Sequence, residues 1–140
     1  MNLTSQNTAS APINLPINHP EVVVELQALY PQYEAALVTN DAASLTQMFW
    51  PSPRVMRFGV TENLYGIEEI AAFRKGRSPA NLVRTILRLD IVTFGRDYGS
   101  ITLEFERTVD GRTIFGRQSQ VWVRFDEGWK IVAAHVSLLP

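Results

Sequence analysis

The chain has 140 residues, of which 46% are hydrophobic and 19% charged, a composition typical of one soluble globular domain. Its formal net charge of −1 gives no general attraction to nucleic acid or anionic membranes, and the lack of cysteine excludes disulfides, thiol catalysis and cysteine–zinc sites. No apolar run approaches the roughly 20 residues that cross a bilayer, and residues 1–11 do not resemble a signal peptide, so we expect no membrane association and a cytoplasmic protein.

The N-terminal residues are expected to form an arm and then a helix. Residues 1–18 are rich in Ser, Thr, Asn and Pro, which predicts a flexible arm before one domain over residues 19–140. A helix is predicted from Pro20 until Asn40, with apolar residues at helical spacing. Tyr33 lies on its apolar face, so its hydroxyl needs a buried partner, which is either a backbone carbonyl of the core or a ligand.

The middle of the chain alternates short helices with a strand. Asp41 can cap a second helix, and residues 54–60 alternate as a strand of which either face could be buried. The pattern therefore leaves Arg57 either inside the protein or in solvent. A third helix follows, and Arg74 and Arg77 prolong its apolar stripe. These arginines either line an interior site or extend from the stripe into solvent.

The C-terminal half reads as strands, and its last hairpin spans residues 112–139. Because helices precede strands, the predicted fold class is α+β, with a curved antiparallel sheet forming a cone that N-terminal helices close. In the last hairpin, the faces that carry Val121 and Ile131 are predicted to be buried. Polar residues continue these two faces and would form either a buried network or the floor of a pocket: Arg117, Ser119, His135 and Ser137.

The chemistry of the site can be narrowed by exclusion. The two histidines lack metal-binding spacing, and the sequence has no glycine-rich nucleotide loop and no nucleophile elbow, so we expect neither metal nor cofactor. Burying an arginine without an anionic partner costs several kcal/mol, and the predicted interior offers few carboxylates, with Glu62 and Glu104 as the candidates. Converging arginines would therefore bind a small carboxylate. The predicted binding residues are Arg74, Arg77, Arg117, Gln118, Ser119, His135, Ser137 and Glu62.

Several segments together resemble a known family. They include Tyr33-Glu34, Arg57-Phe58-Gly59, Phe73-Arg74, Gly116-Arg117-Gln118-Ser119-Gln120 and Gly128-Trp129-Lys130-Ile131-Val132-Ala133-Ala134-His135-Val136-Ser137. Over residues 19–139 the chain resembles the small cone-shaped proteins of the nuclear-transport-factor-two-like and polyketide-cyclase (SnoaL)-like superfamily. Within that superfamily it is most similar to a bacterial group found beside amidases in cyanuric acid and oxalurate catabolism.

The resemblance implies a homodimer and a decarboxylating amidohydrolase that converts dicarboxyurea to allophanate, carbon dioxide and ammonia. It also implies that Tyr33 and Arg57 are the catalytic pair. Arginines would hold one carboxylate, and Tyr33 would give a hydrogen bond or a proton to the leaving nitrogen or the carbonyl oxygen. Two alternatives stay open. One is an isomerase or cyclase, which would require an aspartate facing the interior, and the sequence predicts none there. The other is a non-catalytic dimeric accessory or ligand-binding protein for an amidase.

Overall fold

The computed structural model describes residues 14–140, and the first thirteen residues of the predicted arm lie outside this range. The helices of the described part are α2 (Pro20–Val38), α3 (Ala42–Gln47) and α4 (Ile67–Gly76). The strands are β1 (Met56–Phe58), β2 (Asn63–Tyr65), β3 (Thr85–Phe94), β4 (Tyr98–Val109), β5 (Arg112–Phe125) and β6 (Gly128–Leu138). No helix within residues 14–140 has the length and apolar character needed to cross a membrane.

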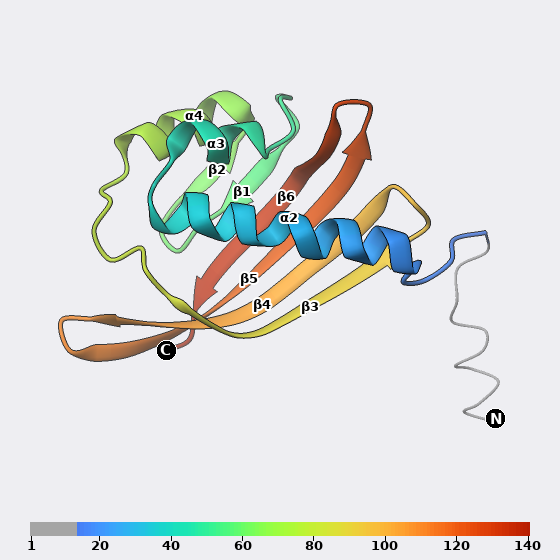
Figure 1. The fold of residues 1–140 in the computed structure, drawn as a ribbon. Coiled ribbons are helices and arrows are strands. Elements are labelled where there is room, and N and C mark those ends of the chain that lie inside the picture. Colours follow the sequence, from blue (N-terminus) through green and yellow to red (C-terminus); the bar gives the residue numbers. More distant parts are fainter. Residues whose placement is uncertain (1–13) are drawn as a thin grey trace, which may run out of the picture.

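One curved, open sheet carries the fold, with strand order β2-β1-β6-β5-β4-β3. The three helices cover one face of this sheet (Figure 1), as expected for the predicted α+β class. Strands β3 to β6 form an antiparallel meander. Strand β1 instead runs parallel to β6, and β2, which was not predicted, pairs antiparallel with β1 at the sheet edge. The sheet is thus mixed where the sequence indicated a purely antiparallel one.

Local sequence determines where the elements begin and end. Helix α2 begins at Pro20 and is followed by Asn40, whose φ of 51° reverses the chain. The side chain of Asp41 then caps α3 by accepting a hydrogen bond from the Ser44 amide at 3.2 Å. Near the end of β3, the chain is joined to the N-terminal residues, because the Asn18 amide donates to the Thr93 carbonyl at 2.9 Å.

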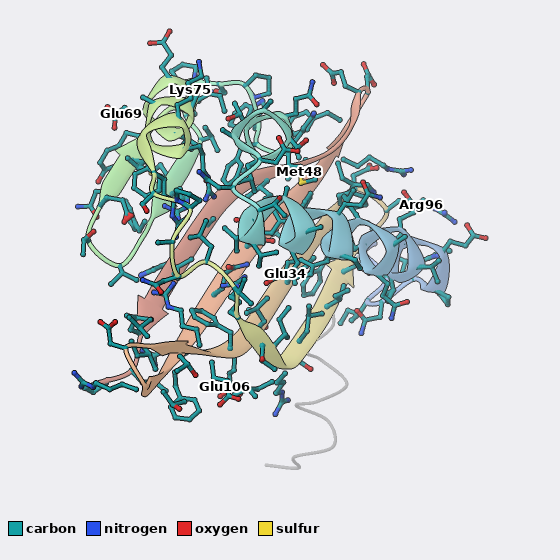
Figure 2. The ribbon with its side chains drawn as sticks, turned by 60° about the vertical axis from the view of Figure 1, so that its left-hand side comes forward. Glu34, Met48, Glu69, Lys75, Arg96 and Glu106 are labelled. Carbon is teal, nitrogen blue, oxygen red and sulfur yellow. The ribbon has the colours of Figure 1, made fainter. Side chains whose placement is uncertain are left out.

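The hydrophobic core lies between the helices and the covered face of the sheet. Leu26 of α2, Ile70 of α4 and Trp122 of β5 are all fully buried in this layer. Glu34 points from α2 toward the sheet (Figure 2), so this interface also contains charge. Lys75, in contrast, lies on the exposed side of α4. The interface between the helices and the sheet is therefore apolar near the start of α2 and contains charged residues toward the end of α2.

The prediction for the last hairpin had the wrong face buried. In β5 the buried residues are Gly116, Gln118, Gln120 and Trp122. Arg117 and the other residues that alternate with this buried row therefore face away from the helices. In β6 the pairing changes register, because Val121 faces Ala133 whereas Trp122 faces Ile131. This bulge inserts one extra residue into β6 and reverses the side-chain alternation. Ile131 is therefore buried, whereas the residues at positions 133, 135 and 137 face the outer side of the sheet.

Candidate functional site

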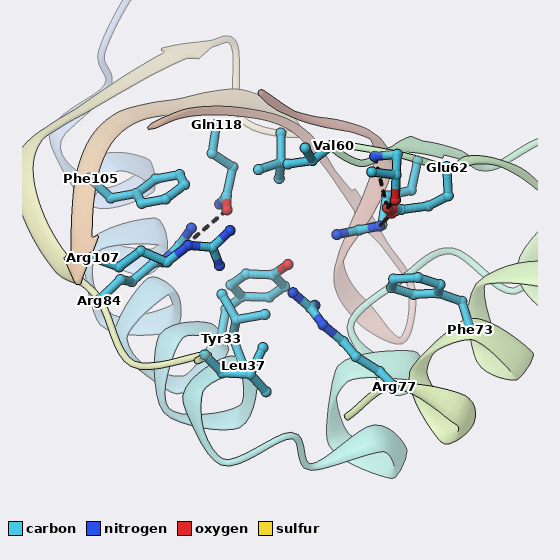
Figure 3. A pocket seen from close by; sticks show the side chains of 14 residues that line it. Tyr33, Leu37, Val60, Glu62, Phe73, Arg77, Arg84, Phe105, Arg107 and Gln118 are labelled. Carbon is cyan, nitrogen blue, oxygen red and sulfur yellow. Dashed lines mark hydrogen bonds and ion pairs between the residues drawn. The ribbon is translucent and has the colours of Figure 1, made fainter. Parts of the chain in front are cut away.

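A cavity of about 320 Å³ opens between the helices and the covered face of the sheet. Figure 3 shows Arg84 and Arg107 on one side of it, Glu62 and Phe73 on the opposite side, and the Tyr33 hydroxyl between them. Its size suits a small molecule. The lining residues are Tyr33, Leu37, Arg57, Val60, Thr61, Glu62, Phe73, Arg77, Leu82, Arg84, Phe105, Arg107, Gln118 and Val136.

Arg57 is a buried cation on the side of the cavity that Glu62 and Phe73 line. It lies on β1, is 4% exposed, and its guanidinium stands 5.1 Å from the centre of the Phe73 ring. Its Nη1 is 3.5 Å from Glu62 Oε2, which is an ion pair without a hydrogen bond, and its Nε has no partner among residues 14–140. Glu62 reaches this place by folding over Gly59, where a Cβ would collide with the carboxylate. Glu62 is therefore a weak counter-ion for Arg57.

Arg77 extends into the same cavity from the C-terminal end of α4. Its guanidinium stands 5.6 Å from the Phe73 ring centre, and its buried Nη1 lacks a hydrogen-bond partner within the described chain. Burial, together with the nearby charges of Arg74 and Arg57, lowers the pKa of Arg77 to about 10. A cation with a lowered pKa is one whose charge the surroundings do not fully neutralise, so an anion bound beside Arg77 would be stabilised.

The opposite side is built around Arg84, which precedes β3. Its Nε and Nη2 donate to the two oxygens of Glu34, each at 2.9 Å. Nη2 also lies 3.2 Å from Tyr30 Oη and 2.9 Å from Gln118 Oε1, and Gln118 Nε2 donates to Tyr30 Oη at 3.2 Å. The hydrogen bonds to Glu34 raise the pKa of Arg84 above its ordinary value despite burial. This part of the wall is a neutralised, fixed network.

Arg107 extends the same side from β4. The Phe105 ring lies between the two arginines, with Arg84 4.4 Å and Arg107 6.0 Å from its centre. Phe105 can lie flat there because its neighbour on β5 is Gly116, whose added Cβ would come within 2.2 Å of the ring. Burial and the charge of Arg84 lower the pKa of Arg107. Arg107 is thus the less neutralised cation of the pair.

Tyr33 connects the two sides. It is buried, and its hydroxyl accepts a hydrogen bond from Arg74 Nη2 at 3.2 Å. Burial alone would raise the pKa of Tyr33, but the surrounding cations outweigh burial and lower it from 10.0; they are Arg74, Arg57 and Arg84. Tyr30, one turn earlier, behaves oppositely, because burial and the nearby Glu34 carboxylate raise its pKa. Two adjacent tyrosines therefore differ in acidity, and the more acidic one faces the cavity.

Positive charge exceeds negative charge around this cavity. Within the described residues, five arginines and two glutamates lie on or directly behind the cavity wall, which gives an excess of three positive charges. Uncompensated buried guanidinium groups are costly, so an anion fits the cavity better than a neutral molecule. No cluster of three metal-ligating side chains occurs among residues 14–140.

The structure brings together some of the predicted site residues and separates others. Tyr33, Arg57, Glu62, Arg77 and Gln118 line the cavity, and Arg74 lies behind Tyr33. Four predicted binding residues are on the outer face of the sheet, because β5 is turned over and β6 contains the bulge: Arg117, Ser119, His135 and Ser137. The expected carboxylate Glu104 is also outside. Glu62 contacts Arg57, so it competes with an anionic ligand rather than binding it.

Sequence reasoning missed three charged residues of the site. Arg107 continues the buried alternate row of Leu103 and Phe105 on β4, so the spacing of two could have found it. Arg84 lies just before β3, where strand alternation does not fix the side-chain direction, and no sequence signal singles out Glu34 beyond the family resemblance. The Glu34–Arg84 ion pair joins residues 50 positions apart, which no local pattern indicates.

A curved open sheet with helices over one face defines the nuclear-transport-factor-two-like class, also described as a cystatin-like fold. Within this class, the chain belongs to the AtzH-like family, whose model matches residues 15–140. The family match therefore spans all of the domain and the site just described.

Two solved structures are similar in both sequence and fold. A protein of unknown function from Pectobacterium atrosepticum is 46% identical, with a TM-score of 0.83, covering 89% of this chain and 95% of that one. A cystatin-like fold protein from Burkholderia xenovorans is 40% identical, also with a TM-score of 0.83, covering 91% and 100%. A putative ketosteroid isomerase from Parabacteroides distasonis shares the fold at 19% identity, with a TM-score of 0.65, covering 92% and 94%. No curated protein matches significantly.

Proposed function

We propose that the cavity binds a small dicarboxylate and catalyses its decarboxylation, with an N-carboxylated urea such as dicarboxyurea as the substrate. The observation that carries this proposal is the set of incompletely paired buried arginines around Tyr33. An anion that filled the cavity would supply the missing partners. The resemblance to the cyanuric acid and oxalurate group supports the choice of a carboxylated urea, and the lowered pKa of Tyr33 supports proton transfer at this position.

The two sides of the cavity suit the two ends of such a substrate. Arg57 and Arg77 lie near Phe73, and Arg107 lies across the cavity beside Phe105. Arg84 is already paired with Glu34, so it contributes less to ligand binding. A dianion could therefore place one carboxylate on each side and its urea nitrogen near the Tyr33 hydroxyl.

The chemical step needs a proton and no metal. In the decarboxylation R–NH–COO⁻ + H⁺ → R–NH₂ + CO₂, the C–N bond breaks and its electron pair goes to the nitrogen, which takes the proton. Tyr33 donates that proton and recovers one from water, while Arg57 stabilises the negative charge that develops on the urea. Dicarboxyurea and allophanate contain the same two nitrogens, so this step releases no ammonia. The ammonia implied by the resemblance does not fit the atom balance.

The direct test measures carbon dioxide release from dicarboxyurea by the purified chain, relative to the spontaneous rate. We expect Tyr33→Phe to lower kcat by roughly 10²–10⁴-fold, and Arg57→Met to lower kcat/KM strongly, while both variants stay folded. Arg88→Met is a matched control, because Arg88 is exposed on the outer face. A wild-type rate equal to the spontaneous rate would contradict the proposal. Binding without turnover would support the accessory ligand-binding alternative.

We also propose that two copies associate through the outer face of the sheet. This face carries exposed apolar side chains, such as Met56 and Phe115, beside charges of both signs, such as Arg117 and Glu104. A surface with both signs can pair with itself across a two-fold axis. Light scattering of the purified chain should give the mass of a dimer, and Arg117→Glu should shift it toward the monomer. A monomeric wild type at high concentration would contradict this proposal.

A further inference from the structure

Arg74 occupies an unusual position beside the cavity. It is 0% exposed on α4, and it is not among the residues that line the cavity wall. Its Nη2 donates to Tyr33 Oη at 3.2 Å, while its Nε and Nη1 find no hydrogen-bond partner in the described part of the chain. Its guanidinium also stands 5.9 Å from the Phe49 ring centre. Arg74 therefore reaches the cavity only through Tyr33.

This arrangement is unfavourable for folding. A buried guanidinium with unpaired N–H groups costs several kcal/mol, and an apolar side chain of similar volume is often neutral or stabilising in its place. No carboxylate of residues 14–140 forms a salt bridge with Arg74, unlike Arg84, which is paired with Glu34. Among the described residues, the phenol oxygen of Tyr33 is its one polar contact. A charge retained under such conditions suggests a contribution to function.

We propose that Arg74 is a positioning residue that acts through Tyr33. It holds the Tyr33 hydroxyl toward the cavity, and it stabilises the phenolate that remains when Tyr33 gives its proton to the substrate nitrogen. In that step the O–H bond of Tyr33 breaks and an N–H bond forms, and Arg74 keeps all its protons. This inference rests on the proposed function and changes the role that the sequence suggested for Arg74, which was ligand binding.

The charged surroundings of Tyr33 agree with this role. Cations face it from β1, through Arg57, and from the segment before β3, through Arg84, while Tyr30 lies 5.7 Å away between ring centres. Arg74 is the cation that also donates a hydrogen bond to the phenol oxygen. Removing Arg74 would leave Tyr33 buried with less compensation, so its pKa should rise.

The experiment compares Arg74→Met and Arg74→Lys, each with and without Tyr33→Phe, in two measurements. The first is ultraviolet titration of the phenolate in the ligand-free protein, with the Tyr33→Phe curve subtracted to isolate Tyr33. The second is the pH dependence of kcat and KM for dicarboxyurea decarboxylation. Arg77→Met is the control, because Arg77 follows directly after the same helix but lines the cavity itself.

We expect Arg74→Met to move the Tyr33 titration to higher pH, to lower kcat by roughly 10²-fold or more, and to change KM little. Its Tm should be at or above that of the wild type, whereas Arg74→Lys should shift the titration less. Arg77→Met should raise KM and shift the Tyr33 titration less than Arg74→Met, because Arg77 acts on the phenol by charge alone and donates no hydrogen bond to it. In the Tyr33→Phe background, Arg74→Met should lower kcat no further, since its effect depends on the phenol oxygen.

Several results would overturn the inference. The first is an unchanged Tyr33 titration in both Arg74 variants, and the second is a raised KM in place of a lowered kcat. The third is that Arg74→Met lowers kcat as much in the Tyr33→Phe background as in the wild type. If Arg74→Met does not fold, Arg74→Lys decides through the same titration. The titration needs no substrate, so it tests Arg74 even if no carboxylated urea is decarboxylated. If the protein decarboxylates dicarboxyurea but the Tyr33 titration is the same with and without Arg74, only the positioning role of Arg74 is refuted.

Discussion

The Glu34–Arg84 pair offers a quantitative test of how the site is held together. Arg84 makes two hydrogen bonds of 2.9 Å to the Glu34 carboxylate, and the two side chains are only 4% and 18% exposed. Glu34→Gln removes the negative charge and keeps the shape. The guanidinium of Arg84 then stays buried beside Tyr30 and Gln118, which are neutral acceptors.

The expected loss of stability follows from this burial. Breaking a buried pair by neutralising one partner costs about 3–5 kcal/mol. Water reaches part of Glu34, so we expect a loss below that range, about 2–3 kcal/mol. For a chain of this size the loss corresponds to a fall in Tm of roughly 6–12 °C.

Urea and thermal unfolding can measure this loss against an exposed control. Asp90→Asn breaks the Arg88–Asp90 pair, which has a shorter contact of 2.7 Å but side chains 69% and 50% exposed, so it should lower the stability far less than Glu34→Gln does. Adding Arg84→Met to Glu34→Gln should recover part of the lost stability, because no buried charge is then left unpaired. Equal losses for Glu34→Gln and Asp90→Asn would refute this reasoning.

Three further predictions concern the same cavity. Glu62→Gln should tighten malonate binding by about fivefold, as measured by calorimetry, because Arg57 loses a competing carboxylate; weaker binding would contradict this. Tyr30 has a raised pKa, so the unfolded chain loses that proton first and stability should fall as the pH rises through 10.0; urea unfolding should show a smaller fall in Tyr30→Phe. Gly116→Ala should displace Phe105, cost roughly 1–3 kcal/mol and weaken malonate binding, and an unchanged Tm would speak against that contact.

Sequence reasoning succeeded where the structure depends on local signals. The start of α2 at Pro20 and the cap at Asp41 both involve residues with a specific backbone or capping preference. It also indicated a set of interior arginines, because a guanidinium on an apolar face is unusual. The pattern does not decide whether Arg57 is buried, since both faces of its strand alternate equally well.

The failures came from interactions between distant residues. The register change opposite Val121 is a one-residue event in β6, and it moved His135 and Ser137 to the outer face. The pairing of Arg84 with Glu34 depends on how α2 crosses the sheet. Neither feature leaves a local pattern in the sequence, so half of the predicted binding residues were placed on the wrong face.

The most direct measurement of the central claim compares malonate with malonamide, its neutral diamide of similar shape, in a thermal shift assay. If the excess charge around Arg57 and Arg77 serves a dicarboxylate, malonate should raise Tm, since a ligand at 100 times its Kd adds about 2.7 kcal/mol. Malonamide should not, and Arg57→Met should abolish the malonate effect. Equal shifts with both compounds, or a malonate shift that survives Arg57→Met, would contradict an anion site in this cavity.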